Sequence, residues 1–309
     1  MYTTNDNLWG IILAGGEGRR LREFIRTRYH SNVPKQYCTF IGTRSMLRHT
    51  IDRCEMLIPP ERLLTIISRH HLQYAQHHLY DRPSGTVIIQ PYTRETASGI
   101  LYPLLHIHTR EPDALVAIFP SDHFVLKEDR FMDYVRFAAE FIEYSPHSMV
   151  LLGVEPDHPE KEYGWIEINS EIRHDKWKRI FTIRRFIEKP DAFDIQFAGK
   201  NLWNTMVCVC RVHTLLDHFR TLTPNLYETF QRIKNLLGSS REKDAVEKIF
   251  THLAPVNFSR ALLEKNPEGL CVLRMDDVYW NDWGNPERIL SDLRRLTKPI
   301  LFRNEVAIG

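Results

Sequence analysis

Short apolar segments recur along the first half of the chain, and longer stretches of mixed polarity separate them. The apolar segments are rich in valine, isoleucine and leucine, and they cover residues 8–14, 63–68, 86–90, 114–119 and 148–154. Runs of this length are typical of buried strands, whereas most of the stretches between them have the amphipathic spacing of helices. The alternation predicts a largely parallel sheet with helices on both faces.

The pattern changes from about residue 160. Residues 163–168 and 180–187 form shorter strand-like pieces with turns between them, which predicts an antiparallel insertion. Residues 211–253 return to helical spacing, and Pro224 is expected to open a helix. The second half of the chain is therefore expected to combine a small antiparallel part with further helices.

A glycine-rich segment at residues 13–21 follows the first apolar run, and Pro34-Lys35-Gln36 comes shortly after it. Glycines let backbone N–H groups approach phosphates, and Arg19 and Lys35 carry permanent positive charge, so the combination favours binding of a nucleoside triphosphate. The segment has neither the Walker sequence nor the Gly-x-Gly-x-x-Gly spacing. A turn that closes a βα unit for geometric reasons alone would carry the same glycines, so both interpretations stay open here.

Two aspartates follow apolar or aromatic segments that lie far apart in the sequence. Asp122 comes directly after the buried run at 114–119, and Asp282 lies among the aromatic residues of 278–284. If the two carboxylates converge, they would bind one Mg²⁺ ion over a triphosphate. Each aspartate alone is better explained as a helix cap or a turn residue. We expect Trp283-Gly284 to turn the chain tightly after Asp282.

A third charged segment, residues 186–191, ends a predicted strand. Lys189 could neutralise the phosphate of an acceptor, and Glu188 could accept hydrogen bonds from sugar hydroxyls. The alternative is a charged strand end that stops at Pro190, because proline cannot continue the ladder of hydrogen bonds.

Composition narrows the class of protein. The 309 residues are 43% hydrophobic and 26% charged, with a net charge of +2, which gives no argument for a nucleic-acid partner. No signal peptide or spanning segment is recognised, so we expect a cytoplasmic protein without a membrane partner. The five cysteines are expected to be buried free thiols. The cluster His70, His71, His77 and His78 is expected to lie on a surface helix rather than to bind metal.

Taken in order, these segments resemble a known family over roughly residues 8–290. The matching segments are 13–21 with 34–36, 90–97, 119–123, 153–156 with 162–166, 186–191, 203–205 and 280–284. The chain resembles bacterial mannose-1-phosphate guanylyltransferases, within the wider group of sugar-1-phosphate nucleotidyltransferases. The resemblance implies a Rossmann-like α/β fold, the nucleotide-diphospho-sugar transferase fold, with a mixed, mostly parallel sheet and a small antiparallel insertion that binds the acceptor.

The resemblance also assigns roles to individual residues. It implies that the glycine-rich loop binds the triphosphate, through Leu13, Ala14, Gly15, Gly16, Gly18 and Arg19. Contacts to the base and ribose would come from Gln90, Arg94 and Thr96, and contacts to the sugar phosphate from Gly164, Glu188, Lys189 and Asn204. The magnesium-binding positions would be Asp122 and Asp282, and the catalytic ones Arg19, Lys35 and Asp122.

The implied reaction is transfer of a nucleoside monophosphate from a nucleoside triphosphate, with GTP favoured, to a sugar 1-phosphate, with mannose 1-phosphate favoured. We expect one domain over 1–309, with a nucleotide-binding half at about 8–155, a sugar-phosphate-binding half at about 156–290 and a tail at 291–309. The longer relatives' appended isomerase-like domain is not expected within this chain. A homodimer is left open.

Several positions depart from the family's usual residues. Asn204-Thr205-Met206 lacks a glycine that many members have beside the sugar, and Glu95-Thr96-Ala97-Ser98 replaces a usual Asn-Thr-Ala-Pro. An acidic residue usual before residues 261–265 is missing, and Gln90 stands where several members have glutamate. The same reaction with another base or sugar therefore stays open, as does a regulatory protein that binds nucleotide sugars without catalysis.

Overall fold

The computed structural model describes residues 7–30, 32–191 and 201–297. Its strands in chain order are β1 Leu8–Ala14, β2 Leu63–Ser68, β3 Val87–Gln90, β4 Leu115–Pro120, β5 Phe124–Val125, β6 Met149–Val154, β7 Gly164–Asp175, β8 Lys178–Glu188, β9 Asn201–Arg211, β10 Leu270–Met275 and β11 Trp280–Asn281. Its α-helices are α1 Arg22–Tyr29, α2 Met46–Glu55, α3 Leu72–Ala75, α4 Glu95–Arg110, α5 Glu128–Tyr144, α6 Val212–Leu222, α7 Pro224–Gln231, α8 Glu242–His252 and α9 Pro286–Thr297. No helix among these residues is both long and apolar enough to cross a bilayer.

The central sheet has nine strands in the order β3-β2-β1-β4-β9-β6-β10-β8-β7. Strands β3, β2, β1 and β4 pair in parallel, and all four come from the first half of the chain. Strand β9 runs antiparallel between β4 and β6, and β7 and β8 form a long antiparallel pair. The mixed α/β fold with a parallel core is thus confirmed.

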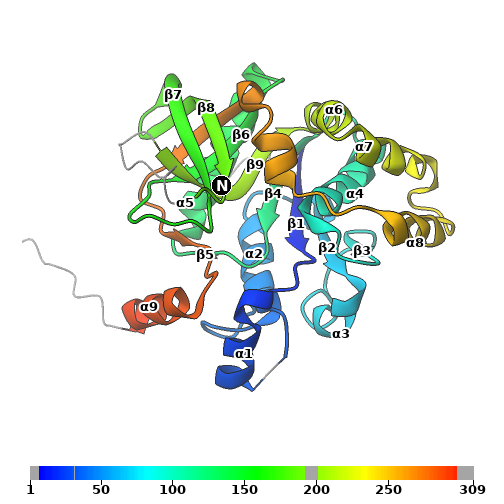
Figure 1. Ribbon diagram of the computed structural model, residues 1–309, viewed down its shortest axis with the longest axis horizontal. Helices are drawn as coiled ribbons and strands as arrows, with labels where there is room; N and C mark the ends of the chain where they lie inside the picture. Colours follow the sequence, from blue (N-terminus) through cyan, green and yellow to red (C-terminus); the bar gives the residue numbers. More distant parts are fainter. Residues whose placement is uncertain (1–6, 31, 192–200, 298–309) are drawn as a thin grey trace, which may run out of the picture.

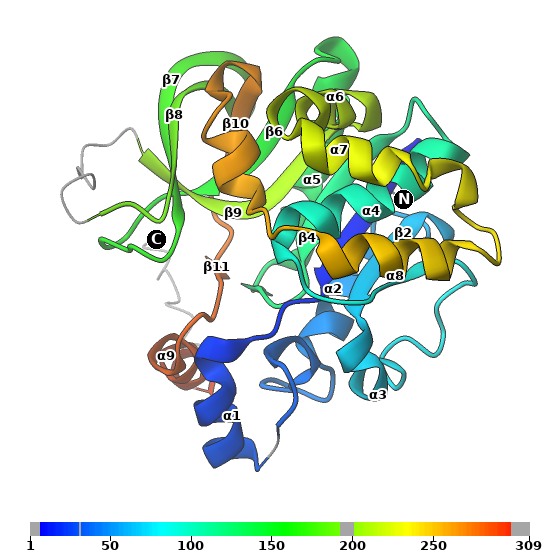
Figure 2. The same cartoon turned by 45° about the vertical axis from the view of Figure 1, so that its right-hand side comes forward.

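Helices cover both faces of this sheet because its strands are apolar on both faces. Side chains of α4, α6, α7 and α8 pack with one set of strand residues, and these helices lie together in Figure 2. Side chains of α2 and α5 pack against the other face. The run at 114–119 is fully buried between the two layers, as its lack of polar residues predicts.

A third, smaller cluster brings the end of the described chain back to its beginning. Ile289 of α9 and the fully buried Trp283 pack with Leu21 and Ile25, beside α1 in Figures 1 and 2. Strand β11 pairs antiparallel with β5, which directly follows the segment of Asp122. This pairing carries residues 280–282 to the carboxyl end of β4. The expected boundary between residues 290 and 291 falls inside α9.

The histidine-rich segment differs from the sequence prediction. Only Leu72–Ala75 is α-helical there, after a 3-10 turn, and His71 is buried with its ring edge-on to Tyr37 at 5.6 Å between centroids. His78 Nδ1 lies 3.1 Å from Ser45 Oγ. The predicted surface helix is therefore wrong for His71 and His78, because the His71 ring is buried and the partly buried His78 ring stacks on Tyr37. The described residues contain no cluster of His, Cys, Asp or Glu able to hold a metal.

Candidate active site

The glycine-rich loop leaves β1 at the carboxyl end of the parallel strands. Gly18 has φ of 59°, a left-handed conformation in which a side chain is strained, and a Cβ there would lie 3.1 Å from Lys35 N. The buried Gln36 side chain donates from Nε2 to Ala14 O at 3.0 Å and to Gly16 O at 2.9 Å. Gln36 thereby fixes the conformation of the loop by hydrogen-bonding two of its carbonyl oxygens.

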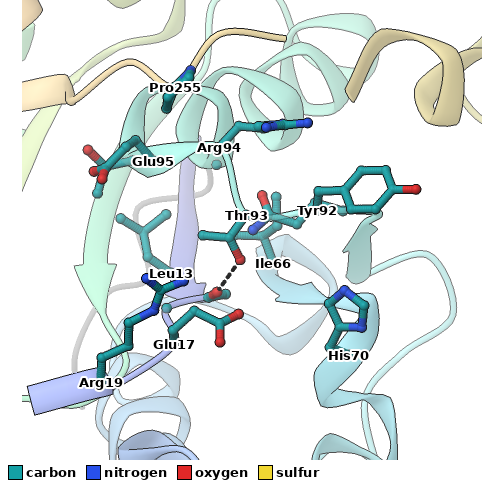
Figure 3. Close-up of a pocket in the computed structure, with 15 residues that line it drawn as sticks. Leu13, Glu17, Arg19, Ile66, His70, Tyr92, Thr93, Arg94, Glu95 and Pro255 are labelled. Atoms are coloured by element: carbon teal, nitrogen blue, oxygen red, sulfur yellow. Dashed lines mark hydrogen bonds between the residues drawn. The ribbon is translucent and has the colours of Figure 1, made fainter. Parts of the chain in front are cut away.

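A cavity of about 620 Å³ opens beside this loop (Figure 3). Most of the residues predicted to contact nucleotide line it: Leu13, Gly15, Gly16, Arg19, Gln90, Arg94 and Thr96. Ala14 and Gly18 do not line it; Ala14 is buried below, and Gly18 packs against Lys35. In Figure 3, Arg19 and Glu95 flank one side of the cavity, and Tyr92 and His70 flank the other. Its size lies within the range of small-molecule sites.

The buried Gln90 side chain, at the end of β3, faces the glycine-rich loop. A Cβ on Gly15 would lie 2.5 Å from Gln90 Nε2, so Gly15 leaves the room that this amide needs. Gln90 Oε1 is buried and has no hydrogen-bond partner within the described parts of the chain. An orphaned acceptor at the cavity wall is suited to a donor from a ligand, since burying it unpaired costs free energy.

Arg94 and Thr96 contribute mainly by holding the cavity wall. Arg94 donates from Nε to Phe250 O at 3.0 Å and from a terminal nitrogen to Thr251 O at 3.2 Å. Thr96 Oγ1 accepts from Phe258 N at 2.8 Å. These bonds attach the start of α4 to the end of α8 and to the segment after it. Nε and one terminal nitrogen of Arg94, and the Thr96 oxygen, are therefore engaged by other parts of the protein.

Lys35 stands where the two predicted metal-binding aspartates meet. It begins a short 3-10 helix and is only 4% exposed. Its Nζ lies 3.0 Å from Asp122 Oδ2 and also donates to the backbone carbonyl of Asp282. The structure thus brings Lys35, Asp122 and Asp282 together. A buried ammonium of this kind is a fixed positive charge beside the loop.

The Asp282 carboxylate is held by a separate set of donors. Its Oδ1 accepts from Tyr163 OH at 2.9 Å, from Arg288 at 2.6 Å and from Gly284 N at 2.8 Å. Its Oδ2 is 3.7 Å from an Arg20 nitrogen. The Asp282 side chain closes a turn by accepting from Gly284 N, and Trp283 within this turn has φ of 45°. The expected turn is present, but the residue with positive φ is Trp283 and not Gly284. Gly284 is needed for space, because a Cβ there would clash with the Asp282 carboxylate.

The electrostatics favour an ionised Asp122. Burial raises the pKa of Asp122, but the charges of Lys35, His123 and Arg20 outweigh it and hold the pKa below its ordinary value. The neighbouring His123 has the opposite balance, since burial lowers its pKa to about 4 and Asp122 only partly compensates. At neutral pH the pair is thus a carboxylate beside a neutral imidazole.

The chemistry of the two aspartates fits a hard divalent cation. Each carboxylate has one oxygen in direct hydrogen bonds, Oδ2 of Asp122 with Lys35 and Oδ1 of Asp282 with its three donors. The other oxygens have more distant neighbours, with Asp122 Oδ1 at 3.9 Å from His123 Nε2 and Asp282 Oδ2 at 3.7 Å from Arg20. Two carboxylate oxygens are suited to Mg²⁺, which keeps waters and shares phosphate ligands.

The predicted acceptor-binding residues gather on β7, β8 and β9. A Cβ on Gly164 would lie 3.1 Å from Glu188 Oε2 and 3.3 Å from Asn204 Cβ, so these three residues are neighbours. Burial raises the pKa of Glu188, and the Lys189 charge and a Ser259 hydrogen bond oppose this without reversing it. Lys189 has φ of 53° and extends its Nζ toward Glu162 at 3.9 Å.

Sequence reasoning did not assign several residues that shape the site. Gln36, Tyr163 and Arg20 fall within the matching motifs, yet a motif does not say which carbonyl or carboxylate a side chain reaches. Arg288 lies in the first turn of α9, outside every motif that the sequence analysis matched. Its contact with Asp282 depends on the fold at the end of the described chain.

Comparison with known proteins identifies the family of this chain. The model of the "Nucleotidyl transferase" family matches residues 9–298. A mannose-1-phosphate guanylyltransferase of Escherichia coli is 27% identical over 89% of this chain and 59% of its own length. The mannose-1-phosphate guanylyltransferase RfbM of Salmonella typhimurium is 30% identical over 89% of this chain and 56% of its own length. This chain thus spans somewhat more than half the length of these curated relatives.

A solved structure shares the fold. The crystal structure described as mannose-1-phosphate geranyltransferase from Thermus thermophilus superposes with a TM-score of 0.75 at 25% identity. The superposition covers 92% of this chain and 79% of the other. Since the family model spans nearly the whole chain, this protein belongs to the nucleotidyl transferase family.

Proposed function

We propose that this chain is a sugar-1-phosphate nucleotidyltransferase. It transfers a nucleoside monophosphate, from GTP as the favoured donor, to a sugar 1-phosphate, with mannose 1-phosphate favoured, and releases pyrophosphate. One observation carries the proposal: a buried lysine and two aspartates meet at the strand end where a glycine-rich loop opens onto a nucleotide-sized cavity. Family membership and the guanylyltransferases among the relatives support it.

The reaction requires little proton transfer. A phosphate oxygen of the sugar 1-phosphate forms a bond to the α-phosphorus, and the bond from that phosphorus to the oxygen bridging the β-phosphate breaks. Phosphate oxygens are already ionised at neutral pH, so the barrier comes mainly from bringing two anions together in line. Arg19 and Lys35 would stabilise the donor's charge, and Lys189 would stabilise that of the acceptor.

Asp122 and Asp282 would hold Mg²⁺, the cation that this family typically uses. When bound, the ion would neutralise triphosphate charge in the same way as the two basic residues. The Asp122 carboxylate is suited to this role because its pKa is held low, so that it is ionised throughout the neutral range. Lys35 balances part of that negative charge before any substrate binds.

The choice of base and sugar depends on few groups. The orphaned Gln90 Oε1 can accept a hydrogen bond from guanine N1–H or N2–H. An amide is a less exclusive reader of guanine than a carboxylate, because it offers one acceptor oxygen rather than two. On the acceptor side, Glu188 and Asn204 present a carboxylate and an amide side by side to the hydroxyls of a sugar.

The direct test is pyrophosphate release by the purified protein, measured with four nucleoside triphosphates and several sugar 1-phosphates in the presence of Mg²⁺. Turnover with GTP and mannose 1-phosphate above the other pairs is the expected result. Faster turnover of another pair would change the assigned base or sugar. Binding of nucleotide or nucleotide sugar with no pyrophosphate from any pair would indicate a regulatory protein instead.

A further inference from the structure

Met206, in the middle of β9, has an unusual backbone conformation. Its φ is 62°, in the left-handed region that favours glycine. The pairing of β9 with β6 shifts register at the same place, between Leu151 and Gly153 of β6. A long side chain at such a position is strained, and strain of this kind persists only where the surroundings impose it.

Several hydrogen bonds impose the conformation. Met206 N donates to Asn204 Oδ1 at 3.2 Å, and Ser259 Oγ donates to the Met206 sulfur at 3.3 Å. Between them, Thr205 Oγ1 donates to Leu152 O at 2.7 Å. Both the backbone and the thioether end of Met206 are thus fixed in place.

The surroundings of Met206 are those of the expected acceptor site. Asn204, whose amide oxygen holds Met206 N, is 4% exposed, and its Nδ2 is buried without a partner in the described residues. Ser259 Oγ lies within hydrogen-bond reach of both the Met206 sulfur and the Glu188 carboxylate, and its single hydrogen can be donated to one of them at a time. An orphaned amide donor beside a carboxylate indicates a ligand hydroxyl at that point. Met206 itself is half-buried, because it packs against the apolar core without being wholly covered.

We propose that Met206 selects the acceptor: its thioether side chain forms an apolar wall, and the sugar 1-phosphate that fits places a C–H edge, rather than a hydroxyl, against it. This inference rests on the proposed function. A hydroxyl against this wall would lose water and meet only a thioether, whose sulfur is a weak hydrogen-bond acceptor. The hydroxyl that bridges Glu188 and Asn204 would be retained.

The test compares Met206→Gly and Met206→Gln with the wild-type protein. Each is assayed for pyrophosphate release with mannose 1-phosphate and with its C2, C3 and C4 epimers, each of which turns one hydroxyl to another face of the ring. The wild-type protein is expected to favour mannose 1-phosphate over at least one epimer, whose hydroxyl would meet the Met206 wall. Met206→Gly, which suits the positive φ, and Met206→Gln, which adds a polar end, should each lower that kcat/KM ratio by about tenfold or more. The KM for the triphosphate should not change.

Met56→Gly is the matched control, because this exposed methionine lies at the end of α2, outside the site. A ratio unchanged within about twofold in both Met206 variants would overturn the inference, provided that the wild-type protein turns over. Absence of turnover in the wild-type protein with every pair would instead contradict the proposed function.

Discussion

Lys35 places a positive charge between two acidic residues at almost no exposure to solvent. Its buried ammonium contacts the Asp122 carboxylate and the Asp282 carbonyl, so its position is set by residues from two distant parts of the chain. A charge that is already oriented costs no reorganisation when substrate arrives, and such preorganised charges contribute strongly to catalysis.

We expect Lys35→Met to fold and to lose turnover by about 10²–10³, because one fixed positive charge beside the α-phosphate is removed. Initial rates of pyrophosphate release would measure this, with circular dichroism to verify folding. Lys127→Met is the control, since Lys127 is exposed ahead of α5. Wild-type rates in purified Lys35→Met would contradict the catalytic role of Lys35.

Gln90 allows a prediction about the base. Gln90→Glu places two acceptor oxygens at the cavity wall, so the ratio of kcat/KM for GTP over ATP should rise by about tenfold. Competition between the two triphosphates in one reaction would measure this ratio. If the ratio fell or stayed constant, Gln90 would not face the base. Some loss of stability is expected as well, because the new carboxylate would be buried beside Gly15.

Among the secondary-structure elements, α8 is joined to α4 by a small cluster of polar side chains. Glu242 Oε1 contacts Tyr102 OH at 2.6 Å and His106 Nε2 at 2.7 Å, and Glu242 Oε2 accepts from Gly238 N at 2.7 Å. Burial alone would raise the pKa of Glu242, but these hydrogen bonds lower it to about 2. The same helix also receives the Arg94 bonds that hold the cavity wall.

Because the pKa of Glu242 is lower in the folded than in the unfolded chain, its ionised form stabilises the fold above about pH 4.5. That contribution is lost as pH falls from about 4.5 toward 2. Glu242→Gln should lower the free energy of unfolding at pH 7 by about 1–2 kcal/mol, allowing for solvent screening. It should also flatten the loss of stability below pH 4.5. Urea unfolding at pH 7 and pH 3 would measure both effects, with Glu228→Gln on α7 as control.

The sequence predicts the parallel core and the glycine-rich loop well, because both depend on local patterns of apolar residues and glycine. It could not predict that Arg94 binds the end of α8, since that contact joins residues far apart in the chain and the guanidinium suits a nucleotide equally well. His71 was misjudged for a related reason. Its polar neighbours favour a surface position, whereas the fold packs its ring against Tyr37, which lies far away in the sequence.

For the whole molecule, α9 closes the structure by packing on the region of α1. The fully buried Ile289 joins Leu21 and Ile25 in a small cluster, and Arg288 on the same helix holds Asp282. The site thus depends on contacts between the first and last parts of the described chain. A local sequence pattern cannot reveal such a contact, so the motifs pointed to Asp282 but not to Tyr163 and Arg288, which bind its carboxylate.

Ile289→Ala should lower the free energy of unfolding by about 2–4 kcal/mol, because it leaves a cavity in a cluster with few other members. It should also reduce turnover, since Arg288 and Asp282 lose support. Leu296→Ala, a more exposed position on the same helix, is the control and should cost well under about 1 kcal/mol. Thermal unfolding and pyrophosphate release measured on both variants would decide; equal effects would mean that α9 does not brace the site.

All five cysteines are free and buried, and burial raises the pKa of the thiols, to about 12 for Cys38, Cys54 and Cys208. A maleimide reagent should therefore label the native protein only as fast as the molecule opens. Labelling rates would then measure the rate of conformational opening. A cysteine introduced at the surface could carry a fluorophore while the five native cysteines are kept.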